Sequence, residues 1–317
     1  MWKKRLVSMA MALVLAVSLL PTAAWAWSYS VGTFSELKTQ LGKGGTRTIE
    51  VTGTIEVTER LTIKPGADIT ITGGGTLKRA ASFTSGKMFR LNSSFGAYES
   101  NKASLTLENI TVDGGGVKAS DPAFSLGGNA FLTLKNGAVI QNHVSANTHG
   151  GAVEVTGGVL TMEEGSIIQN NATIGYGGGV YCAAGSFIMH GGTITGNRAD
   201  IDGGGVYNEG YPKNNDKSTE VGKGFGIGDH TGKDSTGVIR IEKNELSDDT
   251  TNNVSVGLFS DDRRWTTDAS VNPCAVQYGT FNAARSYIGI SAEIVPSLVV
   301  KHTDSTMQAA FRSDNAA

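Results

Sequence analysis

Three charged residues that stand close together in the sequence could do chemistry: Arg198, Asp200 and Asp202. Carboxylates of this kind bind Ca²⁺, and an arginine beside them could take the proton next to a uronate carboxyl in a β-elimination. The trio is therefore the candidate catalytic site of a polysaccharide lyase or glycoside hydrolase, with Ca²⁺ as cofactor in the lyase case. Asp is equally the ordinary residue of a tight turn, and acids are sparse around the trio. From the sequence we therefore favour a protein that has no catalytic residues and uses no cofactor.

Two tyrosines are candidate ligand-binding residues. Tyr181 and Tyr207 each follow a glycine cluster in the pattern Gly-Gly-Gly-Val-Tyr. Aromatic residues at equivalent places on neighbouring strands stack, and an exposed stack could bind sugar rings. A stack that shields the protein interior is the commoner arrangement, so both alternatives stay open.

Histidines and cysteines do not indicate a metal site. The five histidines are His143, His149, His190, His230 and His302. Their spacing does not match that of metal ligands, so no metal is predicted. Cys182 and Cys274 could pair in an oxidising compartment or remain two separate thiols.

The elements that position these residues come from an internal repeat. Similar segments, each with alternating apolar and polar residues and a closing Asn, lie at 132–142, 160–170 and 188–197. The glycine clusters that follow them lie at 150–151, 177–179 and 203–205. A repeat of about 27 residues that holds several short strands is typical of one coil of a solenoid.

Alternation with a period of two is typical of β-strands, and together with the repeat it predicts an all-β fold. We expect a right-handed, single-stranded parallel β-helix with an apolar core, in which Gly and Asn form left-handed corners. Asn side chains stacked from coil to coil would hydrogen-bond to one another. The predicted Asn ladder comprises Asn142, Asn170, Asn197 and Asn244.

Residues 1–26 are typical of a secretory signal peptide, with a positive start, an apolar stretch and the small-residue pattern Ala24-Trp25-Ala26. We therefore expect a secreted or cell-surface protein with no membrane span after cleavage. An uncleaved N-terminal anchor is the alternative, although the apolar run is short for a bilayer.

The rest of the chain divides by its patterns. Thr33 and Glu36 form a candidate capping box at the start of a short amphipathic helix. The expected parts are an N-terminal cap at 27–42, a β-helix domain at 43–300 with insertions at 80–103 and 209–236, and a polar C-terminal tail at 301–317.

Composition excludes several classes of protein. The chain has 317 residues, with 43 Gly and only 6 Pro, and no strict Gly-X-Y period, which excludes collagen. Its formal net charge is −2, without a cluster of basic residues. Because nucleic-acid binding depends on neutralising phosphates, no nucleic acid is expected as a partner.

The paired motifs Gly-Gly-Ala/Gly-Val and Ile/Val-x-x-Asn resemble the repeats of pectin-lyase-like right-handed β-helix proteins. The nearest resemblance is to bacterial surface proteins and adhesins with Gly-Gly-Ala-Ile and Phe-x-x-Asn repeats. The family includes lyases, hydrolases and non-enzymatic adhesins, so the resemblance implies a fold more than an activity. We expect a non-catalytic role in adhesion, extracellular display or carbohydrate binding, with a polysaccharide or cell-surface glycan as partner. The alternatives are a polysaccharide lyase or glycoside hydrolase with a divergent site, and a structural spacer in a larger surface protein.

Overall fold

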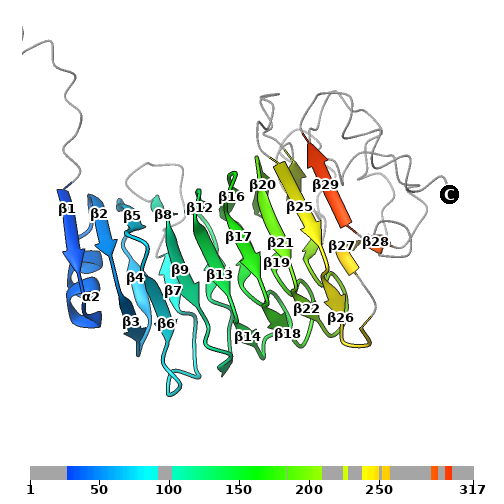
Figure 1. The fold of residues 1–317 in the computed structure, drawn as a ribbon, viewed down its shortest axis with the longest axis horizontal. Coiled ribbons are helices and arrows are strands. Elements are labelled where there is room, and N and C mark those ends of the chain that lie inside the picture. Colours follow the sequence, from blue (N-terminus) through cyan, green and yellow to red (C-terminus); the bar gives the residue numbers. More distant parts are fainter. Residues whose placement is uncertain are drawn as a thin grey trace, which may run out of the picture.

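The protein consists of short strands arranged mainly in parallel sheets (Figure 1). The computed structural model describes residues 27–91, 102–183, 185–208, 224–227, 238–249, 252–257, 287–291 and 297–301. The predicted signal peptide lies outside this described part, as do residues 302–317 of the predicted tail and most of the predicted insertion at 209–236. Within the described part, no helix is long and apolar enough to cross a membrane.

Four sheets account for all of these strands. Sheet A contains β1 (Trp27–Val31), β2 (Thr46–Val51), β5 (Asp68–Thr72), β8 (Ala103–Leu107), β12 (Ala130–Leu134), β16 (Val159–Met162), β20 (Ser186–Met189) and β24 (Gly224–Ile227). Sheet B contains β3 (Thr54–Val57), β6 (Thr76–Arg79), β9 (Ile110–Asp113), β13 (Ala138–Gln141), β17 (Ile167–Gln169), β21 (Gly192–Thr195), β25 (Val238–Glu242) and β29 (Ser297–Lys301). Sheet C contains β4 (Leu61–Ile63), β7 (Phe89–Leu91), β11 (Phe124–Leu126), β15 (Val153–Val155), β19 (Val180–Cys182), β23 (Val206–Asn208), β27 (Asn252–Gly257) and β28 (Tyr287–Ser291). Sheet D contains β10 (Lys118–Ala119), β14 (Val144–Ser145), β18 (Ala172–Thr173), β22 (Arg198–Ala199) and β26 (Glu245–Leu246).

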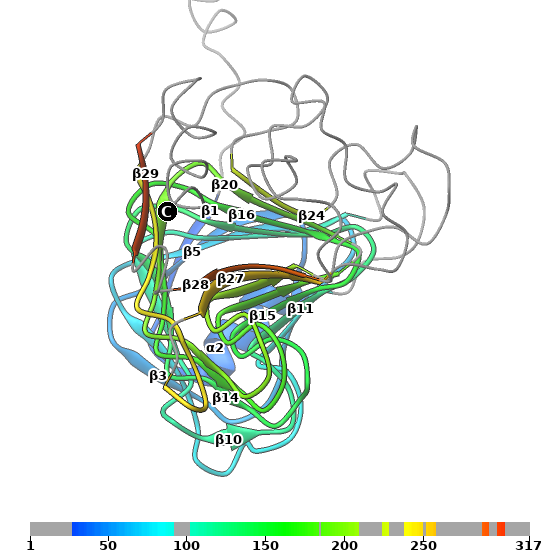
Figure 2. The same cartoon turned by 90° about the vertical axis from the view of Figure 1, so that its right-hand side faces the viewer.

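From β8 to β27 the chain visits the sheets in the order A, B, D, C and then returns to A, whereas the two earlier passages, β2 to β4 and β5 to β7, follow the order A, B, C without a strand of sheet D. One such passage is called a circuit below. Strands of successive circuits pair in parallel, so Leu105, Leu132, Leu160 and Phe187 occupy one register position in sheet A. Figure 2, which looks along the long axis of the molecule, shows the circuits superimposed. The expectation of an all-β protein built from parallel sheets is confirmed, and the arrangement is compatible with a parallel β-helix.

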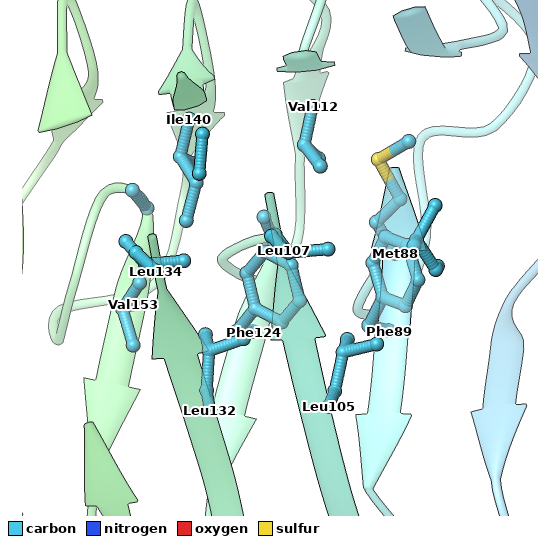
Figure 3. Close-up of a cluster of buried hydrophobic side chains, with 14 of the residues drawn as sticks. Met88, Phe89, Leu105, Leu107, Val112, Phe124, Leu132, Leu134, Ile140 and Val153 are labelled. Carbon is cyan, nitrogen blue, oxygen red and sulfur yellow. The ribbon is translucent and has the colours of Figure 1, made fainter. Parts of the chain in front are cut away.

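The core lies between the sheets and is apolar. In sheet A, Leu132 and Leu134 are buried while Thr133 between them is half-buried, which is the alternation that a one-sided strand requires. Phe89 and Phe124 stack on successive strands of sheet C with ring centroids 4.8 Å apart (Figure 3). Because the register repeats, residues of the same type lie next to one another on successive strands of a sheet.

Among the described residues there is one helix, α2 (Phe34–Gly42), which packs against β4 at the N-terminal end of the core (Figure 1). Thr33 and Glu36 form the capping box: the Thr33 hydroxyl accepts from the Glu36 backbone N–H, and the Glu36 carboxylate accepts from that of Thr33. Leu37 and Leu41 are the buried residues of the helix. The helix therefore covers apolar ends of strands that would otherwise meet solvent.

Several strands differ from the expectations. Residues 27–31 form β1 of sheet A, within the predicted N-terminal cap. Residues 89–91, predicted as part of an insertion, form β7 of sheet C, and residues 224–227, also predicted as insertion, form β24 of sheet A. In each case a short strand is fixed by pairing with its neighbour rather than by its own sequence pattern. At the other end, β28 and β29 pair antiparallel with β27 and β25, where the sequence shows no recognisable cap.

The Asn ladder agrees with the prediction at Asn197 and Asn244, but in the two earlier circuits it lies one residue after the predicted Asn142 and Asn170. Asn142 and Asn170 have positive φ angles of 57° and 54°, a corner conformation that Asn adopts more readily than most residues. The correction has a physical cause: Asn, unlike most residues, suits both a left-handed corner and an interior ladder, so the pattern alone cannot separate the two roles. In the next circuit, Gly196 takes the corner place at φ 64°, which leaves Asn197 one position later.

The observed ladder comprises Asn171, Asn197 and Asn244, all buried, and starts at the buried His143. Asn171 donates from Nδ2 to Asn197 Oδ1 over 2.9 Å, and Asn197 donates to Asn244 Oδ1 over 2.9 Å. Each Oδ1 also accepts the backbone N–H of the preceding member, from His143 to Asn171 over 3.0 Å. The ladder links four successive circuits at the corner between sheets B and D.

Candidate functional site

Four rings gather on the outer side of sheet C: His149, Tyr176, Tyr181 and Tyr207. They are called the aromatic cluster below. Tyr181 and Tyr207 are the middle residues of β19 and β23 and lie at one register position. Their inward neighbours in the strands, such as Val180 and Val206, fill the core, so the tyrosines face outward.

The other two rings arrive from the segment between sheets D and C. His149, Tyr176 and Asp202 lie at equivalent places in three circuits and are joined by parallel backbone bridges. The residue after each is a glycine with positive φ: Gly150 at 71°, Gly177 at 70° and Gly203 at 65°. A glycine there lets the chain turn sharply into the next strand of sheet C, which carries the preceding side chain over that sheet's outer face.

The four rings form a continuous set of contacts. Tyr181 and Tyr207 stack with centroids 5.8 Å apart and an interplanar angle of 4°. His149 stacks on Tyr181 at 4.3 Å, and Tyr176 meets Tyr207 at 4.6 Å with a tilt of 45°. Stacking between the two strands uses ring faces that a ligand would otherwise contact. Tyr181 is only 4% exposed, whereas His149, Tyr176 and Tyr207 are half-buried and keep part of their surface in solvent.

Charged groups border the aromatic cluster. Glu154 lies one strand before Tyr181 at the same register position. Its carboxylate oxygens stand 4.0 Å from His149 Nδ1 and 4.0 Å from Lys87 Nζ. Asp202 lies beside Tyr176 in the backbone bridge, and its Oδ1 accepts the N–H of Gly203 over 2.9 Å. Ring faces next to carboxylates and an ammonium offer both apolar contact and hydrogen-bonding groups for the hydroxyls of a sugar.

Two exposed isoleucines lie in the turns between sheets D and C. Ile174 is 42% exposed and Ile201 is 49% exposed, and each is within two residues of Tyr176 or Asp202 in the chain. Both therefore add exposed apolar surface to the turns between sheets D and C. The side of the molecule that carries the aromatic cluster is therefore the candidate functional site.

The candidate catalytic trio has a different environment. Arg198 in β22 donates to Asp249 Oδ1 over 2.7 Å and lies 3.7 Å from Glu245 Oε2, both in the following circuit. The hydrogen bond to Asp249 raises the pKa of Arg198, which is the wrong direction for a group that must release its proton to act as a base. The backbone N–H of Asp200 donates to the carbonyl oxygen of Thr173 over 3.1 Å. Arg198 thus links its own circuit to the following one through these polar contacts.

The described part of the chain bears on the metal and cysteine predictions. No group of three or more His, Cys, Asp or Glu side chains is placed there to hold a metal ion. Cys182 is buried, and its Sγ lies 3.7 Å from the Gly185 carbonyl oxygen. Cys274 lies outside the described residues, so the predicted alternatives for the two cysteines stay as they were.

The sequence indicated two of the four rings and missed His149 and Tyr176. A usable signal was present, since His149, Tyr176 and Asp202 each directly precede a glycine cluster of the repeat. That position is variable in residue type, whereas Val180-Tyr181 and Val206-Tyr207 repeat after the second and third clusters. Comparisons with protein-family models, with curated proteins and with solved structures found no match to this chain.

Proposed function

We propose that this chain is an exported right-handed parallel β-helix of the pectin-lyase-like kind that binds extracellular glycans without cleaving them. The aromatic cluster is the observation that carries the proposal. Three of its rings, His149, Tyr176 and Tyr207, remain partly exposed, and the mutual ring contacts hold them in place before a ligand arrives. Preorganised rings lose little entropy on binding, which suits the contact of pyranose C–H groups with aromatic faces.

The repeat and the N-terminal residues support the rest of the proposal. Parallel pairing from circuit to circuit is what a β-helix requires, and the predicted signal peptide directs such a domain out of the cell. A non-catalytic role agrees with the environment of Arg198, which is engaged by Asp249 and Glu245. Adhesion or display on a cell surface is the use that we infer for such a glycan-binding solenoid.

A glycan array on the protein without residues 1–26 tests the proposal, followed by calorimetry with the best oligosaccharide. We expect Tyr176→Ala to weaken binding by about tenfold, since one lost ring contact is worth about 1 kcal/mol or slightly more. Tyr29→Ala is the matched control, because Tyr29 in β1 contacts Lys43 and Arg47 at the far end of the molecule. Equal losses in the two variants, or no glycan bound on the array, would refute glycan binding at this site.

The non-catalytic part has its own test. The protein is incubated with pectins and other uronates, with and without Ca²⁺, while unsaturated products and new reducing ends are measured. No turnover is expected. Turnover that Asp202→Ala abolishes would instead establish the lyase or hydrolase alternative.

A further inference from the structure

Arg79, at the end of β6, is a buried cation. Only 2% of its surface is exposed, yet no carboxylate in the described part of the chain lies within 4.0 Å of its nitrogens. Its Nη1 donates to the carbonyl oxygens of Phe83 and Gly86 over 3.1 Å each, and the guanidinium lies over the Phe83 ring. Its Nη2 is buried and makes no hydrogen bond. An unpaired buried charge with an unused donor is costly, so the arrangement needs an explanation.

His143 presents a second unused group close by. It is 2% exposed, and its Nε2 is buried without a hydrogen-bond partner. The ring hydrogen-bonds to the backbone of Val112, just as the ladder residues Asn171 and Asn197 donate to Ile140 O and Ile168 O in later circuits. Since Val112 holds the other ring nitrogen as a donor, Nε2 of the neutral ring is an acceptor.

Glycines separate the two side chains. In the circuit between them, the corner is formed by residues 114–116, which are all glycine. A Cβ on Gly114 would strike the backbone of His143, and one on Gly115 would meet the Arg79 carbonyl oxygen at 3.5 Å. The corner therefore lies against the backbones of both residues, and because its residues are glycines it contributes no side chain to the space between Arg79 and His143.

We propose that Arg79 and His143 form an internal site for one small monovalent anion, of the size of chloride, which binds together with a proton. The anion accepts N–H bonds from Arg79 Nη2 and from His143 Nε2. Because Nε2 of the neutral ring has a lone pair and no hydrogen, it must first take a proton from solvent, and the net uptake is one proton and one anion. At higher pH the same two atoms suit a water molecule, which can accept from Arg79 and donate to His143.

The charges around the site agree with this coupling. Burial and then the positive charge of Arg79 lower the pKa of His143 to about 3, while Asp113 opposes that effect from β9. Asp113 is already hydrogen-bonded to the Gly115 N–H over 2.6 Å and to Gln141 Nε2 over 3.0 Å. Burial lowers the pKa of Arg79 to about 10 against the opposing charge of Asp121, so Arg79 stays protonated. A bound anion would offset the repulsion between Arg79 and a protonated His143.

The experiment measures the Tm of the protein without residues 1–26 in sodium chloride and in sodium methanesulfonate at equal ionic strength. At about pH 4.5, below the ordinary histidine pKa, we expect chloride to raise the Tm by about 4 °C when present at roughly ten times its Kd. The rise should saturate with chloride concentration. At about pH 8 the two salts should give the same Tm, because Nε2 is then an acceptor.

Variants and a direct observation complete the test. His143→Asn and Arg79→Met should abolish the chloride effect, whereas Arg90→Met, a change of an exposed arginine in β7, should keep it. The same Tm in both salts at low pH, or a chloride effect that survives in His143→Asn, would overturn the proposal. If Arg79→Met fails to fold, crystals of the unaltered protein grown with bromide at low pH decide the matter. Anomalous density between Arg79 and His143 supports the site, and density only on the surface refutes it.

Discussion

Replacing Asn197 is the most direct test of which asparagines form the interior ladder and which occupy corner positions. Its Oδ1 accepts the backbone N–H of Asn171 over 3.0 Å and Asn171 Nδ2 over 2.9 Å. Its Nδ2 donates to Ile168 O over 3.1 Å and to Asn244 Oδ1 over 2.9 Å. In Asn197→Ala all four of these hydrogen bonds are lost in a site that is 1% exposed.

The magnitude follows from which partners are left without a replacement. The Asn171 backbone N–H becomes a buried donor without an acceptor, at about 2 kcal/mol, and the lost amide bonds add about 1 to 2 kcal/mol. Asn171 Nδ2 keeps Ile140 O, and Asn244 Oδ1 keeps the Asn197 backbone N–H, so neither is orphaned. We expect a loss of about 3 to 4 kcal/mol, or a Tm lower by about 10 °C.

Asn170→Gly is the matched control, because the repeat pattern places Asn170 and Asn197 in one column. Asn170 is exposed and has φ 54°, a conformation that glycine adopts freely, so the change should shift stability by less than about 0.5 kcal/mol. Urea unfolding followed by circular dichroism measures both variants. If Asn197→Ala costs less than about 1 kcal/mol, or Asn170→Gly costs as much as Asn197→Ala, the assignment of the ladder is wrong.

Three further predictions concern the corners, the helix cap and the acid side of the stability curve. Gly178→Ala should destabilise by more than about 2 kcal/mol in urea unfolding, since its Cβ would overlap backbone carbonyl oxygens of the next circuit, whereas Gly53→Ala meets open space and should be neutral. Thr33→Ala removes the capping box and should cost about 1 kcal/mol, seen as a lower urea midpoint with an unchanged slope. The pKa of His143 is lowered to about 3 in the native state, so between about pH 6.5 and pH 3 the unfolded chain binds a proton at His143 that the native protein does not bind. The free energy of unfolding that is present above about pH 6.5 is therefore lost as the pH falls toward 3. Between pH 7 and pH 5 in a chloride-free buffer this loss is about 2 kcal/mol, and His143→Asn should remove that share of the acid sensitivity.

The sequence predicts the architecture well because the repeat acts on every circuit at once. Alternation such as Leu132, Thr133, Leu134 is repeated in register, so several weak local signals point to the same pairing. The two short strands in the predicted insertions, β7 and β24, have no strong pattern of their own; β7 pairs between β4 and β11, and β24 pairs beside β20. Their existence is a consequence of the edge that the preceding strand offers.

The candidate site could be predicted only in part, because its rings come from two kinds of position. Tyr181 and Tyr207 belong to a repeated strand motif and were found from spacing. His149 and Tyr176 belong to a turn whose residue type varies from circuit to circuit, and only the backbone bridge between them shows that they are equivalent. Contacts between a turn and a neighbouring sheet depend on the path of the turn, which a period of two does not encode.

The glycines of the repeat also meet different structural needs at adjacent positions. Gly177 and Gly203 supply positive φ at the entry to sheet C, whereas Gly178, one position later, is required by close approach of the next circuit. One cluster in the sequence thus serves two physical needs, as Asn serves both the corner at Asn170 and the ladder at Asn197. Where one residue type satisfies two constraints at adjacent positions, a repeat fixes the period but leaves the register uncertain by one residue. Buried polar groups remove that uncertainty, because a ladder shifted by one residue would leave an amide in the core without partners.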